Sequence, residues 1–128
     1  MPVPILKQGT YLIATIQSAL SDSDALRLQD DLMEQVGRFR SKGIIVDVTA
    51  LDVMDSFAAR SLRTLAHMTS LRGADTVIVG IQPEVAFAMV QLGITFEDIQ
   101  TSLDLEEGLA SLNRRAHLPG RTPSARPG

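Results

Sequence analysis

Apolar and polar positions follow two different periods along the chain. Short apolar runs, typical of buried strands, cover residues 3–6, 11–16, 43–48 and 76–81, with a weaker one at 96–100. Between the later runs, apolar residues recur every three or four positions, which predicts helices. Strands that alternate with helices favour an α/β fold, in which a mixed, mostly parallel sheet of about five strands packs with about four helices.

Turn and cap residues delimit the first half of this pattern. Residues 7–10 read as a hairpin-like turn between the first two strands. The polar run Ser21–Asp24 is expected to supply the cap and the first-turn acids of the first helix, which is expected to end at Gly43. Gly73 is expected to end the second helix, which begins near Phe57.

Similar signals mark the second half. Pro83 suits the first position of a third helix that ends at Gly93, and Asp104 with Glu107 could supply the acidic half of a cap for a fourth. The residues that helical spacing places on apolar stripes are Ala25, Leu28, Leu32, Val36 and Phe39, then Ala58, Leu62, Leu65, Ala66 and Thr69, then Val85, Ala88, Met89 and Leu92, and finally Leu105, Leu109 and Leu112.

A length of 128 residues suits one domain, and the 45% hydrophobic content can fill a single core. We expect the folded domain to cover residues 1–116. Residues 117–128 are rich in Pro and Gly and are expected to form a disordered tail. The sequence contains neither a secretion signal nor an apolar run long enough for a membrane span, which predicts a cytoplasmic protein without a membrane partner.

Composition excludes several classes of site. The formal net charge of -3, with scattered Arg and Lys, argues against a nucleic-acid binder. The chain has no cysteine, so disulfides, thiolate metal sites and cysteine nucleophiles are excluded. Its glycines are isolated and do not form a phosphate-binding loop, so no nucleotide cofactor is expected.

The candidate site is the pair Asp55-Ser56, between a buried strand and an amphipathic helix. Free N–H groups and the positive end of the helix dipole favour an anion there, so Ser56 can either cap the helix, a contribution of about 1 kcal/mol, or accept a phosphate. Met54 and Phe57 flank the pair. Each is interpreted either as a core residue or as a contact for a partner.

The two histidines are candidates for a catalytic base. His67 lies eleven residues after Ser56, which on one helix separates them by roughly 16 Å, too far for a proton transfer. We therefore interpret His67 as a surface or packing residue. His117 is a still weaker candidate for a catalytic base.

Asp47, Asp52 and Asp55 surround the turn after the third strand. Asp52 and Asp55 are interpreted as turn formers and Asp47 as a polar residue at the end of the strand. The alternative is a receiver-like domain or small enzyme that uses Asp52 and Asp55. A receiver domain would need an acidic pair after the first strand to hold Mg²⁺, and a Lys at the end of a late strand to contact the phosphate. The sequence has neither, so no metal site is expected.

The stretch from Ile44 to Leu62 closely resembles the STAS domain family, in which an apolar strand, a short turn and an Asp-Ser pair lead into a helix. Phe57-Ala58 after the serine favours the RsbS-type stressosome branch of that family. The resemblance spans roughly residues 3–115, and its further segments are Pro4–Lys7, Leu51–Phe57, Gly80–Pro83 and Leu92–Ile94.

This resemblance implies a regulatory protein without catalysis of its own. It implies co-assembly with RsbR-type STAS paralogues, self-association, and sequestration of an RsbT-type serine/threonine kinase that phosphorylates Ser56 and then leaves. An RsbX-type phosphatase would reset Ser56, and Asp52, Met54, Asp55 and Phe57 are the expected partner contacts beside it. A free anti-sigma-factor antagonist regulated by serine phosphorylation remains the alternative.

Overall fold

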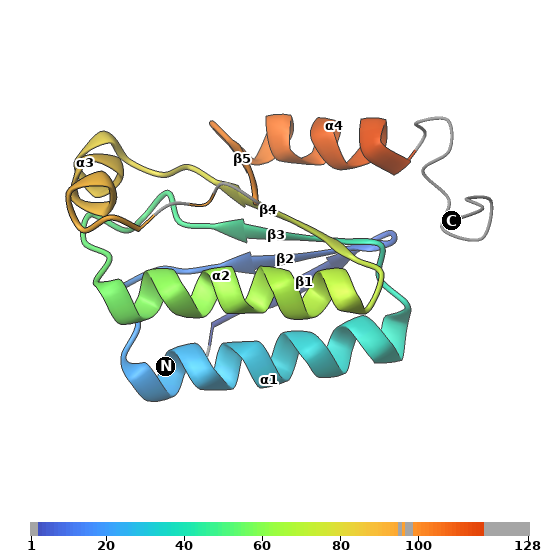
Figure 1. Ribbon diagram of the computed structural model, residues 1–128. Helices are drawn as coiled ribbons and strands as arrows, with labels where there is room; N and C mark the ends of the chain where they lie inside the picture. The colour runs from blue at the N-terminus through green and yellow to red at the C-terminus, as the bar shows by residue number, and fades with distance from the viewer. Residues whose placement is uncertain (1–2, 95, 97–98, 117–128) are drawn as a thin grey trace.

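A computed structural model describes residues 3–94, 96 and 99–116 of the chain. Within them, five strands and four helices alternate after an initial hairpin (Figure 1). The elements are β1 (Ile5–Gln8), β2 (Tyr11–Thr15), α1 (Asp22–Phe39), β3 (Gly43–Asp47), α2 (Ser56–Leu71), β4 (Asp75–Val79), α3 (Pro83–Gln91), β5 (Gln100–Ser102) and α4 (Leu105–Ala116).

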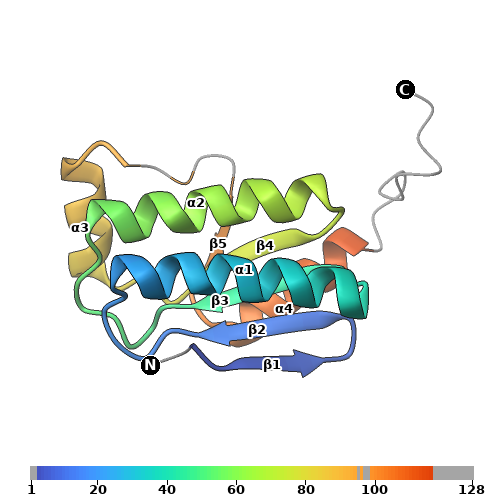
Figure 2. The ribbon, with the colours of Figure 1, turned by 90° about the horizontal axis from the view of Figure 1, so that it is seen from below.

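The five strands form one sheet in the order β1-β2-β3-β4-β5. β1 pairs antiparallel with β2, and the other three pairings are parallel. α1 and α2 lie side by side on one face of the sheet, and α4 lies on the other face (Figures 1 and 2). α3 sits at the end of the sheet where the parallel strands terminate. The predicted α/β fold with a mixed, mostly parallel sheet is confirmed.

Alternate residues of the central strands supply two hydrophobic clusters. Ile44 and Val46 of β3 face the larger cluster, which α1 and α2 cover, whereas Ile45 belongs to a smaller cluster with Leu112 of α4. All four of these side chains are at most 2% exposed. The continuous apolar run in β3 is thereby explained, because helices cover both faces of that strand.

The first helix ends earlier than its glycine suggested. Ser21 and Asp24 form a capping box at its start, as the polar run predicted. The residue in the left-handed conformation at its end is Arg40, with φ 50°, and Gly43 instead begins β3, where Leu112 packs closely on it. The prediction that Gly43 stops the helix was wrong, and so was the inclusion of Phe39 in the core, since Phe39 is 39% exposed beneath Lys7 and Arg38.

The remaining helices follow their signals more closely. Pro83 opens α3, and Asp104 accepts a hydrogen bond from the backbone N–H of Glu107 (2.9 Å) ahead of α4. In α3, Val85 and Met89 are buried as expected, but Leu92 is 56% exposed and was wrongly placed in the core. α3 is short and lies at the edge of the core, so only one side of it can be covered.

Two strand boundaries also differ. β1 runs to Gln8, so the turn before β2 shortens to Gly9 and Thr10. The last strand lies at Gln100–Ser102, later than the expected 96–100, of which residues 97 and 98 lie outside the described part. The tail expected at 117–128, with His117, also lies outside the described residues.

Candidate functional site

The loop from Val48 to Asp55 joins the C-terminal end of β3 to α2. Val48 donates its N–H to Val79 of the neighbouring strand (3.0 Å), and Leu51 donates to Val48 (3.0 Å). Asp47 Oδ1 accepts hydrogen bonds from both the backbone N–H (2.9 Å) and the hydroxyl (2.6 Å) of Thr49. Asp47, the last residue of β3, therefore stabilises the turn that begins this loop.

A second loop holds the first in place. The side-chain amide of Gln82, which precedes α3, donates to the carbonyl of Thr49 (2.6 Å). Gly80 has φ 80°, and a Cβ atom there would overlap the Thr49 side chain. This close approach requires glycine at position 80, so the loops after β3 and β4 form one packed surface at the end of the sheet.

Asp55 caps α2. Its Oδ1 accepts a hydrogen bond from the N–H of Ala58 (2.8 Å), and its carbonyl accepts the first helical bond from Ala59 (3.0 Å). Ser56 is the first helical residue and is half-buried. The interpretation of Ser56 as the N-cap was therefore wrong, because an Asp carboxylate already occupies that role.

The capping by Asp55 leaves the first turn of α2 open to an anion. The N–H groups of Ala58 and Ala59 are engaged, whereas within the described residues neither the hydroxyl of Ser56 nor the N–H of Ser56 or Phe57 makes a hydrogen bond. First-turn N–H groups without an intrahelical partner suit a phosphate or carboxylate oxygen. The serine hydroxyl is thus chemically available at the edge of the molecule.

The apolar neighbours of Ser56 divide into inward and outward side chains. Met54 is 6% exposed and packs into the larger core cluster with Leu51. Val53 is 63% exposed and Phe57 37% exposed. Val53 and Phe57, rather than Met54, therefore present apolar surface beside the serine. Val53 was missed as a site residue, because in an apolar run the inward member cannot be told from the outward one.

α3 adds further apolar surface at the same end of the molecule. α3 lies at the same end of the molecule as the first turn of α2 (Figures 1 and 2). Phe87 is 65% exposed and Val90 71% exposed, although large apolar side chains are usually covered in a single-domain protein. The helix pattern could have indicated these residues, since α3 carries more apolar positions than one face can bury.

Within the described residues, none of the other candidates for chemistry makes a hydrogen bond with the hydroxyl of Ser56. His67 is exposed near the middle of α2, as predicted for a surface residue. Asp52 is exposed in the loop, while Asp55 is used as a cap. Across residues 3–94, 96 and 99–116, no three His, Cys, Asp or Glu side chains are grouped closely enough to hold a metal ion.

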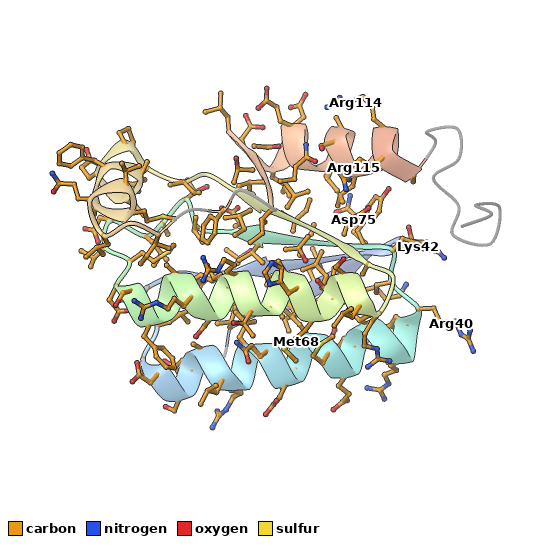
Figure 3. All side chains as sticks on the ribbon, in the orientation of Figure 1. Arg40, Lys42, Met68, Asp75, Arg114 and Arg115 are labelled. Carbon is orange, nitrogen blue, oxygen red and sulfur yellow. The ribbon has the colours of Figure 1, made fainter. Side chains whose placement is uncertain are left out.

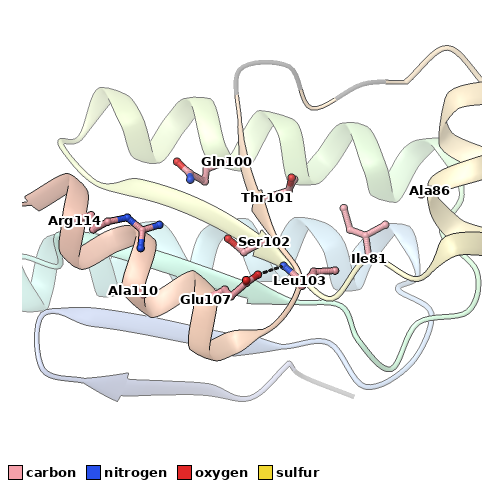
Figure 4. Close-up of a pocket in the computed structure, with 9 residues that line it drawn as sticks. All are labelled: Ile81, Ala86, Gln100, Thr101, Ser102, Leu103, Glu107, Ala110 and Arg114. Carbon is pink, nitrogen blue, oxygen red and sulfur yellow. Dashed lines mark hydrogen bonds between the residues drawn. The ribbon is translucent and has the colours of Figure 1, made fainter.

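A hollow of about 640 Å³ lies along the edge strand β5 (Figure 4). Ile81 and Leu103 line it together with Glu107, which accepts a hydrogen bond from the N–H of Leu103 (3.2 Å). None of the predicted site residues contributes to its wall. In the part of the chain that is described, no helix is both long and apolar enough to cross a membrane.

Comparison with known proteins agrees with this arrangement. The model of the STAS domain matches residues 3–108. RsbRA of Bacillus subtilis (strain 168), named as an RsbT co-antagonist protein, is 28% identical over 109 residues, which cover 84% of this chain and 38% of RsbRA. The chain spans 31–39% of the length of the four co-antagonist relatives that it matches.

Two solved structures cover nearly the whole chain. A Ser-to-Glu variant of Moorella thermoacetica RsbS superimposes with a TM-score of 0.80 and 31% identity, over 91% of this chain and 98% of that one. The second is a chain in a solved structure of the stressosome, which is described as a signal integration and transduction hub. It superimposes with a TM-score of 0.73 and 28% identity, over 90% of this chain and 100% of that one.

Proposed function

The chain belongs to the STAS domain family, and on that premise we propose that it is a non-catalytic regulatory scaffold of a bacterial stressosome. In this function it sequesters an RsbT-type serine/threonine kinase and releases it when Ser56 is phosphorylated, which controls the general stress response. Its other partners are RsbR-type STAS paralogues in a large assembly and an RsbX-type phosphatase that resets Ser56.

The relatives support the choice of partners. The protein is related to RsbS over almost the full length of both chains and to a chain of a solved stressosome. Four relatives are named as co-antagonists of RsbT. Because the chain covers only 31–39% of their length, the common property to carry over is association through the matched part.

The observation that best supports Ser56 as the phosphorylation site is that Asp55, and not Ser56, caps the helix. Asp55 caps the helix, so the hydroxyl of Ser56 is not needed for folding and is available to a kinase. Exposed Val53 and Phe57 beside it, with Phe87 and Val90 on α3, offer apolar area for the kinase to cover. These residues make a coherent docking surface around a modifiable group.

Phosphorylation would change the docking surface more than the fold. It adds about -1.5 to -2 charges at pH 7, beside Asp52 and the Asp55 cap. The open first turn of α2 accommodates the phosphate, so the helix remains stable. A kinase packed over the same surface would have to bury that charge. A hundredfold loss of affinity for the kinase corresponds to about 2.7 kcal/mol of binding free energy. Burying a doubly charged phosphate in the interface can readily cost that much.

Kinase labelling of the serine tests the site. Wild-type chain, Ser56→Ala and Ser70→Ala are incubated with the RsbT-type kinase of the same organism, and phosphate incorporation is measured by mass spectrometry. Ser70 is the matched control because it is an exposed serine at the other end of the same helix. Labelling should be lost in Ser56→Ala and kept in Ser70→Ala. Persistent labelling of Ser56→Ala would show that the kinase phosphorylates another residue.

Retention of partners tests the function. Wild-type, Ser56→Asp and Ser70→Asp proteins are used to capture partners from the host lysate. We expect all three to retain RsbR-type paralogues and only Ser56→Asp to lose the kinase. Recovery of a small complex with an anti-sigma kinase would instead indicate a free anti-sigma-factor antagonist.

A further inference from the structure

A hollow of about 790 Å³ lies at the end of the molecule that is opposite to Ser56. Residues from the last turns of α1, α2 and α4 and from the start of β2 and β4 contribute to its wall. Ser56 is the first residue of α2, whereas the hollow lies at the other end of that helix. A volume of this size suits a small molecule. The hollow is therefore separate from the surface that we assign to the kinase.

The wall of the hollow combines apolar surface with a buried hydroxyl group. Tyr11 and Leu112 supply apolar surface, and Leu112 is 2% exposed. Ser41 also lines the hollow and is 5% exposed, and its hydroxyl makes no hydrogen bond within the described residues. Buried polar groups in folded proteins normally have a hydrogen-bond partner. The hydroxyl of Ser41 is therefore available to a molecule that enters the hollow.

Three cations line the same hollow. Arg40 follows α1, Lys42 precedes β3 and Arg72 follows α2. All three are exposed, and their charged groups make no ion pair within the described part of the chain. Figure 3 shows Arg40 and Lys42 at this end of the molecule. The hollow is thus cationic, although the formal net charge of the chain is -3.

A carboxylate in the wall is already compensated. Among the described residues that line the hollow, the one acidic side chain is Asp75, at the start of β4. Its Oδ1 lies 3.3 Å from Nη2 of Arg115, and Figure 3 shows the two side chains together. Because Arg115 neutralises Asp75, the charges of Arg40, Lys42 and Arg72 remain for an anionic molecule.

A glycine in α1 gives Arg72 its position. Gly37 lies within α1, although glycine is unfavourable inside a helix. A Cβ atom at Gly37 would lie 2.8 Å from Nη2 of Arg72. The guanidinium group of Arg72 therefore lies against the backbone of α1, in a place that a side chain at position 37 would occupy.

Helix dipoles explain only part of this arrangement. Cations favour the C-terminal ends of helices, which accounts for Arg40 and Arg72. Lys42 lies outside the helices. The dipoles also require neither a hollow between the helix ends, nor the available hydroxyl of Ser41, nor a glycine beneath Arg72. Together these features indicate a ligand, and not only the neutralisation of helix ends.

We propose that the hollow binds a small dicarboxylic acid. A guanidinium group donates two parallel hydrogen bonds to one carboxylate, and Arg40 and Arg72 supply two such groups from the ends of different helices. Lys42 adds a third positive charge, and the apolar surface of the wall suits the carbons between the two carboxylates. Because Ser56 lies at the other end of α2, the acid and a kinase can bind at the same time.

Amide NMR spectra of the full chain test the proposal, with adipate as the probe. Hexanoate is the matched control, because it has the same number of carbons but only one carboxylate. Adipate should shift the backbone amides of Ser41, Lys42 and Gly73 and should saturate below about 10 mM. Hexanoate and inorganic phosphate should bind about tenfold more weakly or less. Failure of adipate to saturate, equal binding by either control, or shifts confined to Ser56 and Phe57 would overturn the proposal.

Charge-removing variants locate the binding groups. Arg40→Gln and Arg72→Gln should each weaken the binding of adipate by about fivefold or more, because each removes a guanidinium group that can hold one carboxylate. The matched control is Arg63→Gln, which removes one charge from the exposed middle of α2 and should leave the affinity unchanged. Equal weakening by Arg63→Gln would show that net charge, and not the hollow, governs binding, and would overturn the proposal.

Gly37→Ala separates loss of the site from loss of the fold. The added Cβ atom should displace the guanidinium group of Arg72 and weaken the binding of adipate by about threefold or more. The thermal midpoint should stay the same or rise, because alanine favours a helix more than glycine does. Unchanged affinity for adipate in Gly37→Ala would contradict the assignment of Arg72 to the site.

Discussion

At the scale of single residues, Asp55 and Ser56 have separate tasks. Asp55 stabilises the start of α2 through its bond to the N–H of Ala58, and Ser56 follows with a hydroxyl that the fold does not use. Asp55 therefore supplies the cap, and the hydroxyl of Ser56 is left for the modification that we propose. A serine that also capped the helix would lose its cap whenever it was phosphorylated.

This separation predicts unequal effects of two alanine substitutions. Asp55→Ala should lower the free energy of unfolding by about 1 kcal/mol, because the N–H of Ala58 loses its acceptor. Ser56→Ala should change it by less than half of that, and so should Asp52→Ala as a control for lost charge. Urea unfolding followed by circular dichroism measures all three. An equal loss in Ser56→Ala would mean that the serine contributes to the cap.

At the scale of elements, the N-terminus of α1 depends on a reciprocal cap. Ser21 Oγ accepts a hydrogen bond from the N–H of Asp24 (3.1 Å), and the Asp24 carboxylate accepts one from the N–H of Ser21 (3.4 Å). The hydrogen bonds from the Ser21 side chain and backbone hold the pKa of the Asp24 carboxyl below its ordinary value.

The lowered pKa gives the cap a defined pH dependence. A carboxyl whose pKa is lower in the folded state stabilises the fold above its unfolded pKa of about 3.9, and this contribution disappears as the pH falls through the folded pKa. Ser21→Ala should lower stability at pH 7 by about 1 kcal/mol and move the pKa of Asp24 back toward its ordinary value. Urea unfolding and NMR titration of the carboxyl carbon check both. An unchanged pKa in Ser21→Ala would contradict this account of the cap.

The packing of α4 depends on the absence of a side chain at Gly108. A Cβ atom there would lie 2.7 Å from Val79 Cγ1 of β4, closer than any normal contact. Gly108→Leu should therefore destabilise the protein by about 1–3 kcal/mol, because α4 must move away from the sheet. Ala110→Leu is the control, since Ala110 is exposed on the same helix. Equal thermal midpoints for the two variants would contradict the close approach.

At the scale of the whole molecule, both hydrophobic clusters lie between Leu12 and Leu112 within the described residues. We propose that the folded domain ends at residue 116. A chain of residues 1–116 should unfold cooperatively with the same midpoint as the full chain, as measured by calorimetry. A large loss of stability on truncation would show that residues 117–128 belong to the domain.

The sequence by itself determined the class of fold and singled out Ser56 as the candidate site. The periods of 2 and 3.6 are local properties, so β3, α2 and the buried faces of α1 and α2 could be predicted from them. The motif around Asp55-Ser56 is also local, and the family resemblance is specific because several separate segments of the chain agree with it in order.

Only the tertiary structure decided which of the neighbouring residues face inward. Arg40, and not Gly43, ends α1, because the end of the helix is set by the point where the chain must turn back into β3. Met54 is buried and Val53 exposed, and Asp55 rather than Ser56 caps α2, because a shift of one residue changes the side on which a side chain lies. The cationic hollow arises only when the parallel strands align three helices, since the residues that line it are far apart in the chain.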